Sequence, residues 1–210
     1  MAILITGFAS SENASNASDV VVSSLISDLP ASLKTIQSML HFRIIDANTH
    51  NLKSKINELI RTIRPSNCVF VGQAPGRNNV TLESAATNLR FIGPPLEPEG
   101  KPQSDVISST GPATCKATLP NMNTMVQRLL KNGIPAAISH DAGNSLCNQI
   151  LYEGLQYAEQ NSGHPHCGFI HIPALPQQVI ERWTNYPFMQ LEMSREAVAI
   201  VLLEVAAAGS

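Results

Sequence analysis

Short apolar runs alternate along the chain with longer segments in which apolar residues recur at helical spacing. The short runs predict strands at residues 3–6, 42–46, 68–71, 134–139 and 168–172. The longer segments predict helices at residues 18–29, 52–63, 122–130, 150–158 and 195–207. Strands that alternate with helices are typical of α/β proteins with a mostly parallel sheet covered on both faces.

Local signals mark where the outer helices begin and end. Ser18 can cap the first helix, Pro30 stops it, and Ser194 can cap the last. Residues 91–112 are rich in proline and too irregular for a core element, so we expect a long surface loop or arm there. The 210 residues suffice for one sizeable core, and we expect residues 1–210 to form a single domain.

Charge and hydropathy exclude two classes of partner. The 14 basic and 16 acidic residues nearly cancel, and no run of Lys or Arg could neutralise a row of phosphates, so we expect no nucleic-acid partner. No segment reaches the roughly 18 to 20 apolar residues of a membrane helix, and the apolar start of the chain is too short for a signal peptide. We therefore expect a soluble, cytoplasmic protein without a membrane partner.

The cysteines do not form a recognisable metal or disulfide pattern. The sequence has four of them, without CxxC pairs and without paired histidine spacing, so we expect reduced thiols and no metal site. Cys68 stands in an apolar run, which predicts a small buried side chain on a strand.

Cys147 is a candidate nucleophile. It follows a predicted strand and the turn at residues 141–144, at the expected start of a helix. Free backbone N–H groups and the helix dipole favour a thiolate there and could hold an oxyanion. A buried helix cysteine would give the same local pattern.

His171 and Glu83 are candidate partners of this cysteine. The imidazole of His171 lies in an otherwise apolar strand and needs a polar partner, which a thiol or a backbone group could supply. Glu83 follows a glycine-containing loop, and a carboxylate is the usual group that orients a catalytic imidazole. An exposed glutamate at a helix start would look the same.

Taken together, ordered motifs resemble the pyroglutamyl peptidase I (pyrrolidone-carboxylate peptidase) family of cysteine peptidases. The motifs are ITGF at 5–8, GQAPGR at 72–77, Glu83 with Asn88, GPA at 111–113, TLP at 118–120, GIPA at 133–136, AG at 142–143, CN at 147–148 and GFIHIP at 168–173. The resemblance implies a three-layer α/β/α sandwich and a triad of Cys147, His171 and Glu83. It also implies cleavage of N-terminal pyroglutamate from peptides through a thioester, without a cofactor.

The resemblance also suggests the walls of a pocket for the pyroglutamyl ring. Phe8 matches one aromatic wall and Gln73 matches a polar residue of the lining loop. Two family phenylalanines are missing, because residues 9–13 read ASSEN and Ser145 stands two residues before Cys147. The family arginine that follows the glutamate is absent at its usual place, where Gly93 falls, although Arg90 is near enough to substitute.

These departures leave two alternatives open beside a pyroglutamyl peptidase. One is a cysteine amidase or peptidase with the same triad and a wider or more polar acyl pocket. The other is a non-catalytic relative that binds peptide N-termini, against which the retention of all three triad residues argues. The resemblance further implies peptide substrates with a blocked N-terminus and a homo-oligomer, either a dimer or a tetramer.

Overall fold

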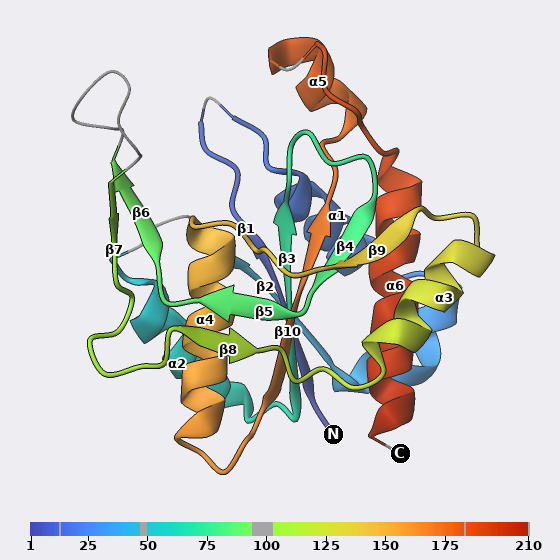
Figure 1. Cartoon of the computed structure of the whole chain (residues 1–210). Coiled ribbons are helices and arrows are strands. Elements are labelled where there is room, and N and C mark those ends of the chain that lie inside the picture. The colour runs from blue at the N-terminus through green and yellow to red at the C-terminus, as the bar shows by residue number, and fades with distance from the viewer. Residues whose placement is uncertain (13, 47–49, 94–102, 183, 210) are drawn as a thin grey trace.

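A six-stranded sheet runs through the middle of the molecule in the computed structural model, which describes residues 1–12, 14–46, 50–93, 103–182 and 184–209 (Figure 1). Its strand order is β2-β1-β3-β10-β4-β9. The strands are β1 (Ile3–Phe8), β2 (Leu40–Ile45), β3 (Asn67–Gln73), β4 (Val80–Glu83), β9 (Ala136–Ser139) and β10 (His166–Ile172). All neighbours pair in parallel except β10 and β4, which are antiparallel, so the predicted mostly parallel sheet is confirmed.

Helices cover both faces of this sheet, which confirms the predicted three-layer sandwich. On one face lie α1 (Ala17–Ser27), α3 (Met122–Lys131) and α6 (Leu191–Ala208), and on the other lie α2 (Leu52–Ile63) and α4 (Leu146–Glu159). Figure 1 shows α2 and α4 on the left of the sheet and α3 and α6 on the right. Among the described residues, no helix combines the length and the apolar character needed to cross a bilayer.

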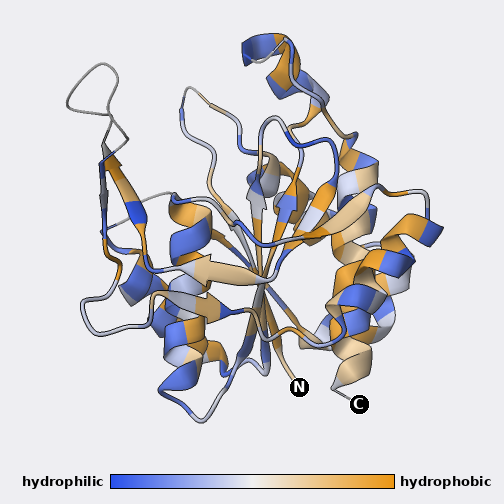
Figure 2. Ribbon diagram, viewed as in Figure 1, coloured by the Kyte–Doolittle hydropathy of each residue, from blue (hydrophilic) through white to orange (hydrophobic). Residues whose placement is uncertain are grey.

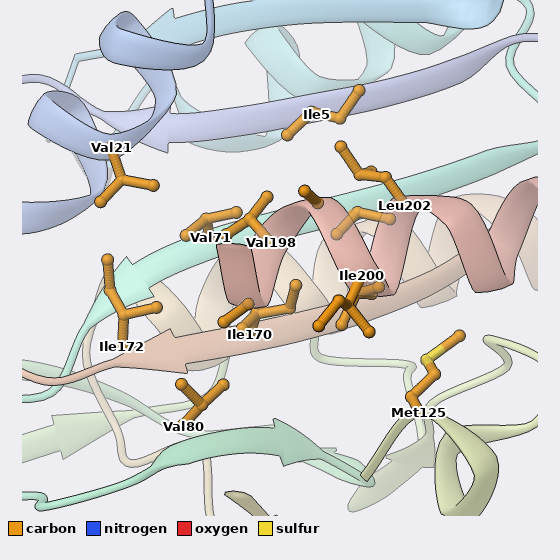
Figure 3. Packing of buried hydrophobic residues seen from close by; sticks show 14 of the residues in the cluster. Ile5, Val21, Val71, Val80, Met125, Ile170, Ile172, Val198, Ile200 and Leu202 are labelled. Carbon is orange, nitrogen blue, oxygen red and sulfur yellow. The ribbon is translucent and has the colours of Figure 1, made fainter. Parts of the chain in front are cut away.

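Successive residues of a strand point to opposite faces, so each strand contributes to two apolar layers. Ile5, Val71 and Ile170 pack against α1 and α6 on the first face, as Figure 3 shows. Phe70, which precedes Val71, and Phe169, which precedes Ile170, pack against α2 and α4 on the second face. Figure 2 shows hydrophobic colour in the central strands and hydrophobic and hydrophilic residues side by side on the helices. The apolar runs identified β1, β2, β3, β9 and β10, whereas β4 was not predicted.

Smaller elements surround the sandwich. Beside α4 lies a small antiparallel sheet of two strands, β5 (Ala85–Thr87) and β8 (Thr114–Lys116). The segment 91–112 begins and continues with strands β6 (Arg90–Gly93) and β7 (Gln103–Asp105), which pair as a hairpin, while residues 94–102 of the predicted arm lie outside the described residues. A 3₁₀ helix at Ala31–Met39 and helix α5 (Pro176–Arg182) complete the described elements.

Two predicted helix caps were wrong. α1 is capped by Asn16, whose side-chain oxygen accepts the backbone N–H of Ser18 at 3.0 Å, because Ser18 turns its own hydroxyl to the N–H of Phe8. α6 begins after Gln190 and places Ser194 inside the helix, where it is fully buried. The side chain of Asn16 thus caps α1 in place of Ser18, and α6 has an additional turn before Ser194.

Leu25 and Ile26 give a matched test of this packing on α1. Leu25 is fully buried, whereas Ile26 is 54% exposed. Leu25→Ala should lower the free energy of unfolding by about 2–5 kcal/mol, because it leaves a cavity in the core. Ile26→Ala should change it by about 0.5 kcal/mol or less. Urea denaturation of both variants measures the difference, and equal losses would contradict the described packing.

Candidate active site

Two neighbouring strands, β10 and β4, bring polar side chains to one point on the α4 face of the sheet. In the strand register, His171 of β10 lies opposite Gly72 of β3 on one side and Thr81 of β4 on the other. Val80 and Leu82 belong to the core of the opposite face, so Thr81 and Glu83 point to the same face as His171. The antiparallel insertion of β4 thereby sets a carboxylate beside an imidazole.

Glu83 and His171 form a buried contact. Nδ1 of His171 lies 2.8 Å from Oε1 of Glu83, and the two residues are 0% and 4% exposed. The same oxygen accepts the Thr81 hydroxyl at 2.9 Å and Nη1 of Arg77 at 2.5 Å. Because these donors converge on one carboxylate oxygen, the side chain of Glu83 is held in a single orientation.

Glu83 is ionised in this environment. Burial by itself would raise the pKa of the Glu83 carboxyl, but its interactions with His171, Ser139 and Arg77 outweigh burial and lower the pKa to about 2. An ionised acceptor leaves the proton of the shared hydrogen bond on Nδ1 of His171. The second ring nitrogen, Nε2, is then unprotonated and able to accept a proton.

Cys147 reaches the same place from α4, where it is the second helical residue. A Cβ built on Gly72 would lie 2.8 Å from Sγ of Cys147 and 2.5 Å from Cζ of Phe169, so the sulfur occupies the space that a larger residue would fill. Gly72 is the register partner of His171. The missing side chain at Gly72 therefore lets the thiol lie against β3 at the position that is paired with His171.

The predicted thiolate at the helix start is not favoured in the resting structure. Burial, followed by the negative charge of Glu83, raises the pKa of Cys147 to about 12, although Arg77 and the backbone N–H act in the opposite direction. Burial also lowers the pKa of His171, more than Glu83 raises it. The thiol of Cys147 and the imidazole of His171 are thus both neutral in the resting structure.

Asn148 fixes the first turn of α4 and was not predicted as a functional residue. It is fully buried, accepts the N–H of Thr87 at 2.8 Å, and donates to the carbonyl oxygens of Thr87 and Leu89 at 2.8 Å each. These bonds tie the helix start to β5 and to the chain leading into β6. The position of Cys147 along the sheet depends on this anchor.

The four predicted pocket residues lie in different places. Phe8 is buried at the carboxyl end of β1 on the α4 face, and Ser145 is exposed at the start of α4, so both border the region of Cys147. Gln73 points to the other face, where Oε1 accepts the N–H of Ala17 and the amide of Gln178. Arg90 pairs with Asp105 on the β6–β7 hairpin at 3.3 Å, and the structure does not bring it to Glu83 or His171.

Residues that the sequence did not single out complete the arrangement. Arg77 and Gly72 lie in the GQAPGR motif, but nothing in the motif showed which residue would meet the glutamate. Thr81 had a usable signal, because the alternation of Val80–Glu83 is that of a strand with one polar face. Within the described residues, no three metal-ligating side chains gather into a metal site.

Comparison with known proteins agrees with this architecture. A sequence model described as "Pyroglutamyl peptidase" matches residues 1–208. The pyrrolidone-carboxylate peptidase of Bacillus velezensis is 34% identical over 152 residues, which are 72% of this chain and 69% of that protein. Pyrrolidone-carboxylate peptidase 2 of Photorhabdus laumondii is 37% identical over 145 residues, 69% of this chain and 66% of that protein.

A solved structure extends the likeness to the whole chain. A mutant pyrrolidone carboxyl peptidase from the hyperthermophile Pyrococcus furiosus superposes with a TM-score of 0.84 at 27% identity, covering 100% of both chains. Fold and relatives together define a cysteine peptidase built on an α/β/α sandwich. The chain belongs to the pyroglutamyl peptidase family, which confirms the resemblance drawn from the motifs.

Asn148 and Asn161 allow a matched test of the anchor on α4. Asn148→Ala leaves one N–H and two carbonyl groups without their partner, so the free energy of unfolding should fall by about 2–4 kcal/mol. Asn161 is exposed and donates to one carbonyl, that of Tyr157. Asn161→Ala should cost about 1 kcal/mol or less. Chemical denaturation compares them, and an equal or smaller loss for Asn148→Ala would refute the anchor.

Proposed function

We propose that this protein removes N-terminal pyroglutamate from peptides, with Cys147 as nucleophile, His171 as base and Glu83 as the group that orients the imidazole. The observation that carries this proposal is the buried contact between Glu83 and His171, on the face of the sheet where Cys147 lies in the first turn of α4. General-base catalysis by a histidine requires a carboxylate that is fixed in place and hydrogen-bonded to the imidazole, and Glu83 meets both conditions. Family membership supports the same chemistry.

The resting protonation states define the first step. Because Nδ1 of His171 is engaged by Glu83, Nε2 receives the proton of the Cys147 thiol as the sulfur attacks the acyl carbonyl. The thiolate need not exist beforehand, which accords with its raised pKa. The imidazolium that forms is stabilised by the ionised Glu83.

The start of α4 supplies the second requirement, which is stabilisation of the oxyanion. The first N–H groups of an α-helix have no partner within the helix, and the helix dipole is positive at that end. Cys147 is among these first residues, so the attacked carbonyl oxygen develops its charge next to such donors.

The remaining steps return the residues to their resting state. The tetrahedral intermediate breaks its C–N bond, and the departing amine takes the proton from Nε2 of His171. A water molecule then gives a proton to the same nitrogen and attacks the thioester. The second tetrahedral intermediate breaks its C–S bond, and Nε2 of His171 returns the proton to the sulfur. The products are free pyroglutamate, a peptide with a new N-terminal amine and the Cys147 thiol.

Substrate choice is the point at which a second candidate has support. Phe8 is buried at the carboxyl end of β1, as an aromatic wall of a lactam pocket would be. Ser145 is exposed beside Cys147, where the family usually has an aromatic ring, and this favours a wider acyl pocket. The second candidate is therefore a cysteine amidase or peptidase with the same triad and broader acyl specificity.

A substrate panel tests the proposal and separates these candidates. Under reducing conditions the wild-type protein should hydrolyse a pyroglutamyl chromogenic amide faster than prolyl and alanyl analogues. Cys147→Ala should retain the fold and lose nearly all turnover. Cys115→Ala, which removes a thiol on β8, should retain both the fold and the turnover. Faster cleavage of the analogues would favour the broader amidase, and an active Cys147→Ala variant would contradict the triad.

The pH dependence tests the role of Glu83. His171 must be neutral to accept a proton, and burial places its pKa below the usual 6.5, so kcat/KM should fall only as the pH drops below that value. Since the Glu83 charge raises the pKa of His171, Glu83→Gln should move this acid limb to lower pH. It should also reduce kcat by about 10²–10⁴-fold, because the imidazolium loses its counter-charge. Steady-state rates between pH 4 and pH 8 decide this, and an upward shift would refute the assignment.

A further inference from the structure

Arg77 joins three segments that build the proposed site. It lies in the loop after β3, and its Nη1 donates to Oε1 of Glu83 at 2.5 Å and to the hydroxyl of Thr81. Its Nη2 donates to the carbonyl oxygen of Asp141 at 2.8 Å. Asp141 belongs to the loop between β9 and α4, which leads directly to Cys147.

We propose that Arg77 is a positioning residue, which holds the Glu83 carboxylate on His171 and ties the loop that precedes Cys147 to that carboxylate. This inference rests on the proposed function, because it assigns Arg77 a part in the same reaction. Arg77 acts through Glu83 and the loop, not through contact with the reacting atoms.

The need for a cation follows from the burial of Glu83. The Glu83 side chain is fully buried, and an ionised carboxylate in such a place is costly unless a paired charge and hydrogen bonds compensate it. The neutral imidazole of His171 supplies a hydrogen bond but no charge. Arg77, with a side chain 29% exposed, extends its charge from the edge of the site to the buried oxygen.

The planar guanidinium also explains why this cation is an arginine. Its two terminal nitrogens donate in different directions, one to Glu83 and Thr81 and the other to the backbone of Asp141. A lysine ammonium can compensate the carboxylate, but it is a compact point charge without this fixed fork. Substitution of Arg77 by lysine keeps the positive charge and removes the fork, whereas substitution by methionine removes both.

Arg77 and Glu83 act on His171 in opposite directions. The charged groups that face the imidazole are Glu83 of β4 and Asp141 of the β9–α4 loop, which raise its pKa, and Arg77, which lowers it. On the neighbouring strand its register partner is Gly72, which carries no charge, and the neutral thiol of Cys147 lies against that glycine. Loss of Arg77 should raise the pKa of His171, whereas loss of Glu83 should lower it.

The first test compares substitutions of Arg77. Arg77→Met should reduce kcat about ten- to a hundred-fold through misplacement of the triad, and it should move the acid limb of kcat/KM upward by roughly 0.5 pH unit or more. Arg77→Lys should bring the acid limb back toward wild type and restore kcat only in part. Arg128→Met, which breaks a pair with Glu204 between α3 and α6, should leave both quantities unchanged.

A double-mutant cycle distinguishes action through Glu83 from an independent role. In the Glu83→Gln background, Arg77→Met should lower kcat by less than about three-fold relative to Glu83→Gln alone, because the carboxylate that Arg77 positions is already absent. Losses that multiply would overturn the proposal, as would an unshifted acid limb in folded Arg77→Met. If Arg77→Met fails to fold, a wild-type kcat in Arg77→Lys would overturn the claim that the guanidinium fork positions Glu83 and the loop at Asp141.

An NMR titration of the His171 ring separates this inference from the proposed function. An upward shift of its pKa in Arg77→Met supports the coupling even if the wild-type protein cleaves no pyroglutamyl substrate, in which case only the proposed function fails. Hydrolysis by the wild type combined with an unmoved His171 pKa would overturn the inference alone.

Discussion

The hydrogen bond between Glu83 and His171 is the constraint on which the site depends. It places a carboxylate and an imidazole inside an apolar sandwich, at 0% and 4% exposure. Burying such a pair is costly unless hydrogen bonds and an opposite charge compensate the carboxylate. The donors that meet Glu83 supply this compensation at Oε1, to which Thr81 and Arg77 are both directed, whereas the buried Oε2 has no hydrogen-bond partner among the described residues. A polar cluster of this kind restricts the ring of His171 to one orientation, with Nδ1 turned to Glu83 and Nε2 outside this hydrogen bond.

The topology of the sheet makes this contact possible. β4 runs antiparallel to β10, and it lies between β10 and β9 in the strand order. Its two polar residues therefore meet β10 sideways, while the loop after β9 crosses toward α4 on the same face. α4 packs on β3 and β10, so its first turn comes to rest above Gly72. β3, β4, β10 and the start of α4 thus meet at one point, and Asn148 fixes the start of α4 there.

Much of the fold was predictable because buried strands are apolar throughout. β1, β2, β3, β9 and β10 and the five long helices follow the predicted runs closely. β4 was missed, since four residues after an irregular loop carry little periodic signal, and Glu83 then resembled the start of a helix. The sequence indicated Cys147, His171 and Glu83 as candidates but not the orientation of their partners, because register and side-chain direction are set by tertiary packing. Gln73 shows the same limit, since one residue of shift along β3 decides which face a side chain meets. Cytoplasmic location, homo-oligomers and a single domain stay predictions.

The tautomer of His171 is the most direct measure of whether this contact organises the site. Nitrogen-15 NMR of the imidazole in the resting wild-type protein near neutral pH distinguishes the two ring nitrogens and needs no substrate. The geometry predicts a proton on Nδ1, shared with Glu83, and an unprotonated Nε2. A proton on Nε2 with Nδ1 bare, or a doubly protonated ring at that pH, would contradict the central claim that Glu83 prepares His171 to act as the base.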